Sequence, residues 1–236
     1  HTVWYHSTMP LSSLSASNQN YLKAVWSLQE WNSAPVTPSL VAEKTGMKLS
    51  TVSDAVRRLS EKGLLDHAPY GAITLTAEGR TFAIGMVRRH RLIETFLVEM
   101  LGHSWDLVHD EAEALEHAVS DFMIDRLDAL LGHPKRDPHG DPIPSPAGDI
   151  DYPEASLLTD TEPGSRLRIE RISDDDPALL QFFSEHGIGV GVEFVTRAGA
   201  PFSDAIEIVL GAEGSAIPLG RGATDAVWVS LVDRGE

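Results

Sequence analysis

The sequence predicts an α+β protein with three parts: an N-terminal winged helix-turn-helix, an all-α middle part and a small C-terminal β-barrel. Three observations support this prediction. Three short helical patterns precede two strand-like runs, two long amphipathic patterns follow, and short β-rich segments separated by turn residues fill the remainder. We place the domains at residues 11–76, 77–148 and 149–236, and leave residues 1–10 out of the fold argument because they show neither a signal-peptide pattern nor a structural one.

The first domain is predicted from helical spacing and helix-end residues. Apolar residues recur at helical spacing over Asn18–Glu30. Thr37 caps a second helix that Gly46 closes, and a third helix covers Leu49–Lys62. Strand-like runs and the turn between them follow at 64–67, 72–75 and 69–71. This order of elements is typical of a winged helix-turn-helix.

The middle part is predicted to contain two long helices, Ala77–Leu101 and Leu107–Leu131. Their wide apolar faces favour packing against a second copy of the chain. Gly132–Gly148 is rich in proline and glycine, so it is either a linker or an ordered extended arm. Further along, a helix-like piece, Ala178–His186, interrupts five strand-like segments at 165–172, 191–196, 205–210, 215–218 and 226–231.

Composition limits the classes of partner and cofactor. No apolar run approaches the roughly 20 residues of a membrane span, so we expect no membrane partner. The absence of cysteine fits a cytoplasmic protein and restricts metal ligands to nitrogen and oxygen, which suit manganese, iron(II), cobalt or zinc. The formal charge is −16, but residues 11–75 carry six basic and five acidic side chains, so the acidity lies outside the first domain.

The third helix is the predicted DNA-reading element, because in this motif its N-terminal residues reach base edges in the major groove. The candidate contacts are polar or basic side chains on this helix, with one residue each from the second helix and the wing. They are Lys48, Ser50, Thr51, Ser53, Asp54, Arg57, Arg58, Ser39 and Tyr70. The alternative is a winged helix used only for protein interaction.

A stripe of ligand-type residues predicts a metal site. His109, Glu113 and His117 are four residues apart and share one helical face, with Glu116 beside it. The preceding helix offers His90 and Glu94 at the same spacing, and burying such groups without a partner is costly. We therefore favour a divalent cation. Three other histidines are expected to be exposed to solvent: His103, His133 and His139.

The alternatives to a metal-gated regulator are a metalloenzyme and a metal-independent regulator. A di-iron oxidase needs Glu-x-x-His on two helices, but the residue three positions after Glu113 is Glu116, and the zinc-hydrolase motif HExxH is missing. We therefore expect no enzyme activity and no small-molecule substrate. A metal-independent winged-helix regulator with structural His/Glu contacts remains an alternative.

The chain resembles the diphtheria toxin repressor family of metal-dependent transcriptional regulators over nearly its whole length. The resemblance depends on four segments: TVS at Thr51–Ser53, RRHRLIE at Arg88–Glu94, VHDEAEALEH at Val108–His117 and DPIPSP at Asp141–Pro146. It implies a cytoplasmic homodimer that binds palindromic operators and controls metal-uptake genes. It also implies that the C-terminal domain is SH3-like.

The resemblance further implies two metal sites in each subunit. One would consist of Asn20 together with Glu113, Glu116 and His117. The other would consist of His90, Glu94 and His109, with help from the C-terminal domain, where we expect Asp176 to be the ligand. Iron-type members have a cysteine at the position of Glu113, and manganese-type members a carboxylate. We therefore expect manganese(II), with iron(II) as the alternative and other divalent first-row metals as possible substitutes. Asn20 departs from the aspartate of manganese-type members, and Lys23 cannot bind a metal while it is charged.

Overall fold

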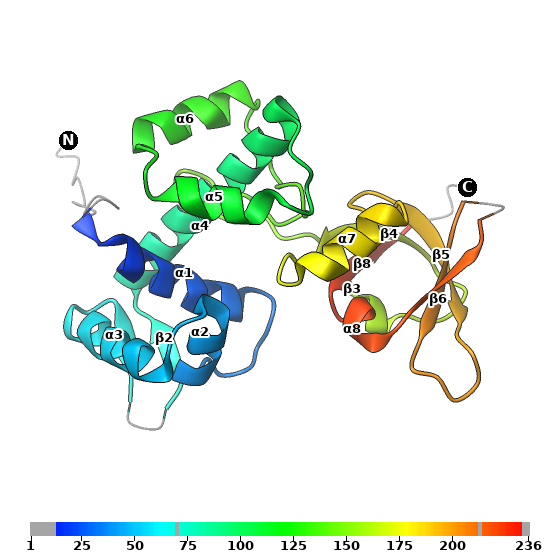
Figure 1. The fold of residues 1–236 in the computed structure, drawn as a ribbon, viewed down its shortest axis with the longest axis horizontal. Coiled ribbons are helices and arrows are strands. Elements are labelled where there is room, and N and C mark those ends of the chain that lie inside the picture. Colours follow the sequence, from blue (N-terminus) through cyan, green and yellow to red (C-terminus); the bar gives the residue numbers. More distant parts are fainter. Residues whose placement is uncertain (1–12, 69–70, 212–213, 233–236) are drawn as a thin grey trace, which may run out of the picture. The chain divides into compact units, whose positions relative to one another are not determined.

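The computed structural model describes residues 13–68, 71–211 and 214–232 (Figure 1). The chain divides into two compact units. The first unit comprises the described residues up to His90 together with Pro144–Asp149, and the second comprises Arg91–Ile143 together with the described residues from Ile150 onward. The boundary falls within a continuous helix, α4 (Ala77–Leu101).

The first unit contains the predicted winged helix-turn-helix. Its elements, in chain order, are α1 (Ala16–Glu30), α2 (Pro38–Thr45), α3 (Leu49–Glu61), β1 (Leu65–His67) and β2 (Ile73–Leu75). The two strands pair antiparallel, which forms the wing. Tyr70, expected at the wing, lies outside the described residues.

Local sequence explains where the helices of this unit begin and end. The Thr37 hydroxyl accepts a hydrogen bond from the Leu40 amide at the start of α2. Gly46 ends α2 in the left-handed conformation, which glycine adopts without strain. One face of α3 is buried through Val52, Ala55, Val56 and Leu59, so the opposite face is left to solvent.

The helical part of the second unit corrects one prediction. The single helix expected over Leu107–Leu131 is wrong, because two helices lie there, α5 (Val108–Glu116) and α6 (Asp121–Leu130). Ser120 starts the second of them, since its hydroxyl accepts a hydrogen bond from the Met123 amide. The helical spacing of apolar residues continues through the break, so periodicity alone did not reveal it.

The proline-rich stretch is an ordered arm. Asp137, His139 and Asp141 are buried within it. The His139 carbonyl accepts a hydrogen bond from the Ile172 amide, 2.9 Å away, so the arm contacts the C-terminal sheet. His139 was expected to be exposed, and that prediction is wrong, because the arm is buried against its neighbours.

The C-terminal part of the second unit is a six-stranded antiparallel sheet in the order β3-β8-β4-β5-β6-β7. The strands span Ser156–Leu157, Val227–Leu231, Arg166–Ile172, Glu193–Ala198, Ile206–Leu210 and Ala216–Leu219 in that order. The two-residue β3 was too short to give a pattern in the sequence. Helix α7 (Pro177–Glu185) packs on the sheet through Leu180 and Phe183 (Figure 1). A 3-10 turn, η2 (Leu158–Asp160), and the short helix α8 (Arg221–Thr224) complete this part.

None of the helices in the described ranges combines the length and apolar character that a bilayer crossing requires.

Candidate functional site

A buried carboxylate, Glu94, lies at the centre of the candidate metal site. The Nδ1 atom of His109 on α5 lies 3.4 Å from Glu94 Oε1 and 3.1 Å from Oδ2 of Asp174, which follows β4. His90 lies one helical turn before Glu94 on α4. The potential ligand atoms of His90, Glu94, His109 and Asp174 all lie within 4.8 Å of one another. Two nitrogen and two oxygen donors at this spacing suit a divalent first-row cation.

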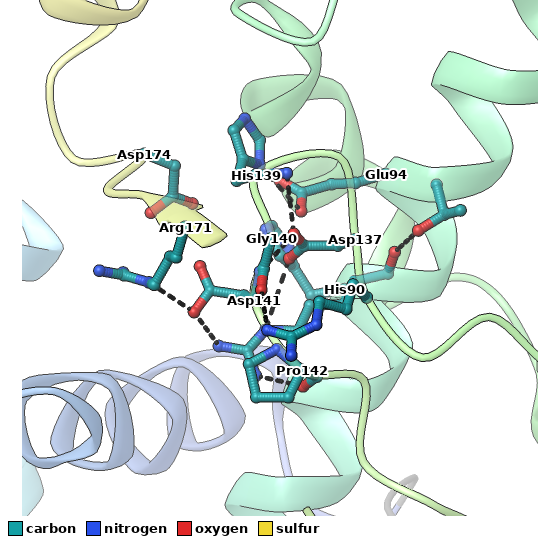
Figure 2. A network of polar contacts seen from close by, with 12 residues as sticks. His90, Glu94, Asp137, His139, Gly140, Asp141, Pro142, Arg171 and Asp174 are labelled. Atoms are coloured by element: carbon teal, nitrogen blue, oxygen red, sulfur yellow. Dashed lines mark hydrogen bonds and ion pairs between the residues drawn. The ribbon is translucent and has the colours of Figure 1, made fainter. Parts of the chain in front are cut away.

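Glu94 also belongs to a second group, which the arm completes. Glu94, Asp137 and His139 are all buried and place their potential ligand atoms within 4.8 Å of one another (Figure 2). His139 Nε2 lies 2.8 Å from the Trp105 carbonyl oxygen, to which it donates a hydrogen bond. This contact orients the ring as carbonyl acceptors orient metal-binding histidines.

The other nitrogen of His139 is positioned to bind a cation. Nδ1 is buried and makes no hydrogen bond among the described residues. It lies 3.8 Å from Glu94 Oε2. When the neutral ring carries its proton on Nε2, the lone pair of Nδ1 faces the Glu94 carboxylate. Two electron-pair donors attract each other only when a proton or a cation lies between them. The residues present therefore fit a metal ion.

Protons take the place of that positive charge when no cation is bound. Burial alone lowers the pKa of His109, but hydrogen bonds to Asp174 and Glu94 outweigh this effect and raise it to about 10. Burial also opposes protonation of His139, whose interactions with Glu94 and Asp137 raise its pKa to about 10. Both rings are therefore imidazolium ions at neutral pH in the metal-free protein.

The two aspartates respond in opposite directions. Burial raises the pKa of Asp174, but its hydrogen bond to His109 outweighs burial and holds the pKa below its usual range. Burial, with the nearby charges of Asp141 and Glu94, raises the pKa of Asp137 to about 8. Asp174 is thus ionised at neutral pH, whereas the raised pKa of Asp137 favours its protonated form.

Asp174, and not the predicted Asp176, is the C-terminal carboxylate that faces the candidate metal site. The Asp176 carboxylate caps α7, accepting hydrogen bonds from the amides of Ala178 and Leu179. A capping carboxylate is already paired with the helix terminus, whereas Asp174, two residues earlier, points to His109. Three residues of these groups were not among the predicted ligands: Asp137, His139 and Asp174. A possible signal was the arm sequence Asp137–Asp141, which carries three ligand-type side chains in five residues.

The remaining ligand-type residues of α5 lie nearer its C-terminal end. Glu116 is fully buried, and its Oε1 lies 3.5 Å from Nε2 of His117, the residue that ends the helix. Glu113 is exposed, and its Oε1 lies 3.8 Å from His109 Nε2. The expected stripe of His109, Glu113 and His117 therefore does not form a single site, because His109 lies near Glu94 and His117 lies beside Glu116.

Helix α1 contributes one further candidate ligand in the first unit. The side-chain oxygen of Asn20 is buried and has no hydrogen-bond partner among the described residues. An amide oxygen without a partner is costly to bury and is a suitable ligand for manganese(II). One turn away, Lys23 Nζ lies 3.5 Å from His90 Nδ1, so the ammonium contacts a candidate ligand without being one.

The candidate DNA-reading residues lie on exposed surface. All those on α3 or at its start, Lys48, Ser50, Thr51, Ser53, Asp54, Arg57 and Arg58, are exposed, as is Ser39 on α2. Two of them make local contacts: Ser53 donates to the Leu49 carbonyl, and Arg57 pairs with Glu61 at 2.9 Å. The buried and exposed faces of α3 are therefore separated as a groove-binding helix requires.

Three family models match the chain. The model described as "Iron dependent repressor, N-terminal DNA binding domain" matches residues 13–73. The model described as "Iron dependent repressor, metal binding and dimerisation domain" matches residues 76–145. The FeoA domain matches residues 157–231, which include most of the C-terminal sheet.

Individual relatives extend over almost the same range. The iron-dependent repressor IdeR of Mycobacterium leprae is 31% identical over 224 residues, which cover 88% of this chain and 95% of the relative. The diphtheria toxin repressor of Corynebacterium glutamicum is 30% identical, with 92% and 97% covered.

Solved structures of similar proteins share the fold. A manganese-dependent transcriptional repressor in complex with manganese is 46% identical with a TM-score of 0.86, and the match covers 91% of this chain and all of the other. The manganese regulator SloR is 28% identical with a TM-score of 0.77, over 91% of this chain and 98% of the other.

Proposed function

Because the chain belongs to the iron-dependent (diphtheria toxin) repressor family of metal-dependent transcriptional repressors, we propose that it is a manganese(II)-activated repressor that binds DNA as a homodimer. The single observation that carries the metal dependence is the buried Glu94, with two groups of nitrogen and oxygen donors around it. Such a cluster is stable only when positive charge neutralises it.

The choice of manganese follows from the donors. The sequence has no cysteine, and the α5 stripe presents Glu113 as a carboxylate. Hard oxygen ligands favour manganese(II), and the repressor solved in complex with manganese is 46% identical to this chain. Iron(II) is the alternative, because relatives of 30 to 31% identity are named iron-dependent or diphtheria toxin repressors.

We assign two metal centres to each subunit. His90, Glu94, His109 and Asp174 would hold one, and Asp137 and His139 would bind the same centre from the arm. Asn20, Glu113, Glu116 and His117 would hold the other. A bound cation supplies the positive charge that protons otherwise supply. Asn20 would then link α1 of the winged helix to α5, and this link is the proposed gate.

DNA recognition would use the exposed face of α3 in each of two subunits. The apolar side chains exposed on α6, Phe122, Met123 and Leu130, supply the surface for self-association. Two recognition helices related by a twofold axis require a palindromic operator, with half-sites a whole number of helical turns apart. We further propose a cytoplasmic location, metal-uptake genes as targets and the domain boundaries 11–76, 77–148 and 149–236.

The test begins with an operator selected from random double-stranded DNA by the purified full chain with manganese(II). Its affinity is then measured by gel shift with manganese(II), with anaerobic iron(II) and after chelation. We expect strong binding only with metal, and stronger activation by manganese(II). Equal binding after chelation would identify a metal-independent regulator, and no selected DNA would reject the repressor.

Variants of α5 test the gate. Glu113→Ala and His117→Ala should abolish the metal stimulation of operator binding and leave the fold intact. Glu111→Ala, an exposed carboxylate on the same helix, is the matched control and should respond like the wild type. Unchanged stimulation in Glu113→Ala would remove this residue from the gating centre.

A further inference from the structure

A buried chain of charges links the C-terminal sheet to helix α4 within the second unit. Arg171 of β4 places its Nε 2.8 Å from Asp141 Oδ1 in the arm. The same Asp141 oxygen lies 3.3 Å from the guanidinium of Arg91 on α4. All three side chains are more than nine-tenths buried. Figure 2 shows Asp141 beside Arg171, with the contact between them marked.

Arg171 and Arg91 each make further contacts that fix their positions. The Arg171 guanidinium lies over the Trp228 ring, 4.2 Å from its centre, so the neighbouring strand β8 fixes its plane. Arg91 donates a 2.7 Å hydrogen bond to the Pro142 carbonyl and lies 3.6 Å from Asp137. Planar guanidinium groups held in this way keep their geometry better than a lysine could.

Backbone packing reinforces the same junction. A Cβ atom on Gly140 would lie 2.1 Å from the Glu170 carbonyl oxygen and 2.9 Å from the Arg171 Cα, so the arm and β4 are in direct contact. The Ile172 amide donates a hydrogen bond to the His139 carbonyl, and Ile172 lies two residues before Asp174. A span of two residues reaches at most about 7 Å, so fixing Ile172 leaves Asp174 little freedom.

We propose that Arg171, acting through Asp141, is a positioning residue that fixes the C-terminal domain on the helical part and so places the Asp174 carboxylate at the Glu94–His109 centre. This inference rests on the proposed function, because it assumes that Asp174 binds the cation. Neither Arg171 nor Asp141 belongs to the proposed ligand sets. Loss of such supporting contacts typically lowers metal affinity by about 10- to 100-fold.

The first readout is a distance within the full chain and needs no metal. Because the chain has no cysteine, Glu111→Cys and Ser184→Cys place one spin label on α5 and one on α7, both at exposed positions. We expect a narrow distance distribution in the otherwise wild-type protein, and a broad one after Arg171→Gln or Asp141→Asn. Arg168→Gln is the matched control, because Arg168 lies on the same strand and pairs with Glu193 at the surface. A narrow distribution in both Arg171→Gln and Asp141→Asn would overturn the proposal.

The second readout is manganese(II) affinity measured by calorimetry. Arg171→Gln should lower the affinity of the Glu94 centre about tenfold when Asp174 is present, and much less when Asp174→Asn has already removed the carboxylate. Equal losses in both backgrounds would mean that Arg171 does not act through Asp174. The wild-type protein in the same titration distinguishes failure of the proposed function from failure of the positioning role. If the wild type binds no manganese, the proposed function is rejected. If the wild type and Arg171→Gln both bind normally, only the positioning role is rejected.

Discussion

His109 Nδ1 lies 3.1 Å from Asp174 Oδ2, so a helix of the middle domain and the segment after β4 share one ion pair. The two residues are far apart in sequence, and one comes from each of two expected domains. Their contact makes the C-terminal domain part of the candidate metal centre.

Asp174 and Asp176 should have separable effects. Asp174→Asn should weaken manganese(II) binding at the Glu94 centre by tenfold or more, in line with the order of magnitude for supporting groups at metal sites. Asp176→Ala should leave binding unchanged and destabilise the protein by about 1 kcal/mol, because it removes the cap of α7. Calorimetric titration and urea unfolding measure the two quantities. The reverse outcome would restore Asp176 as the ligand.

The stability of the metal-free protein should fall as the pH rises from about 7 to 10. The pKa of His109 is raised from 6.5 to about 10, so the folded state favours the charged ring. Its contribution is fully present below pH 6.5 and is lost as the pH rises through the folded pKa. His139 acts in the same direction. Thermal unfolding of chelated protein checks this, with His109→Gln as the control that should show a weaker pH dependence.

Manganese(II) affinity should change in the opposite direction. Binding must displace the protons on His109 and His139, so affinity at the Glu94 centre should rise between pH 6 and 9. Calorimetry in buffers of different ionisation enthalpy counts the protons released. Metal retained without loss at pH 5, or binding without proton release at pH 7, would contradict histidine ligation.

The arm should not tolerate a side chain at Gly140. Its φ of +89° and the close approach of the Glu170 carbonyl both oppose a Cβ atom. Gly140→Ala should therefore lower the free energy of unfolding by about 2 kcal/mol or more. Gly102→Ala is the control, because Gly102 also has a positive φ but faces open space. This substitution should lower the free energy of unfolding by about 1 kcal/mol. Urea unfolding compares them, and equal costs would mean that the arm moves away from β4 easily.

The start of α3 should contribute phosphate contacts. Lys48→Ala should weaken operator binding to a similar extent for all sequences, and reduce the slope of log affinity against log salt by about 1. Lys62→Ala, just after the other end of the helix, is the control and should leave the slope unchanged. Binding measured with manganese(II) at several salt concentrations checks both, and identical slopes for Lys48→Ala and wild type would remove Lys48 from the interface.

Much of this protein is determined by local sequence. Capping by Thr37, the closing Gly46 and the apolar face of α3 define the winged helix-turn-helix without reference to distant residues. The α+β class and the family are confirmed by the matches to both repressor domains and the FeoA domain. The His/Glu spacing on α4 and α5 likewise requires only helical periodicity. These features depend on hydrogen bonds and side-chain spacing within a few residues, which a sequence displays directly.

Tertiary structure alone decided the composition of the Glu94 centre. Asp137, His139 and Asp174 join Glu94 from segments some 40 to 80 residues further along the chain. From the sequence, residues 132–148 could be either a linker or an ordered arm, His139 was expected to be exposed, and Asp176 was expected to be the C-terminal ligand. The physical reason is burial, because packing the arm between α4 and β4 removes water from these groups. A carboxylate or imidazole that has lost its water is stable only with a proton, a cation or a hydrogen-bond partner.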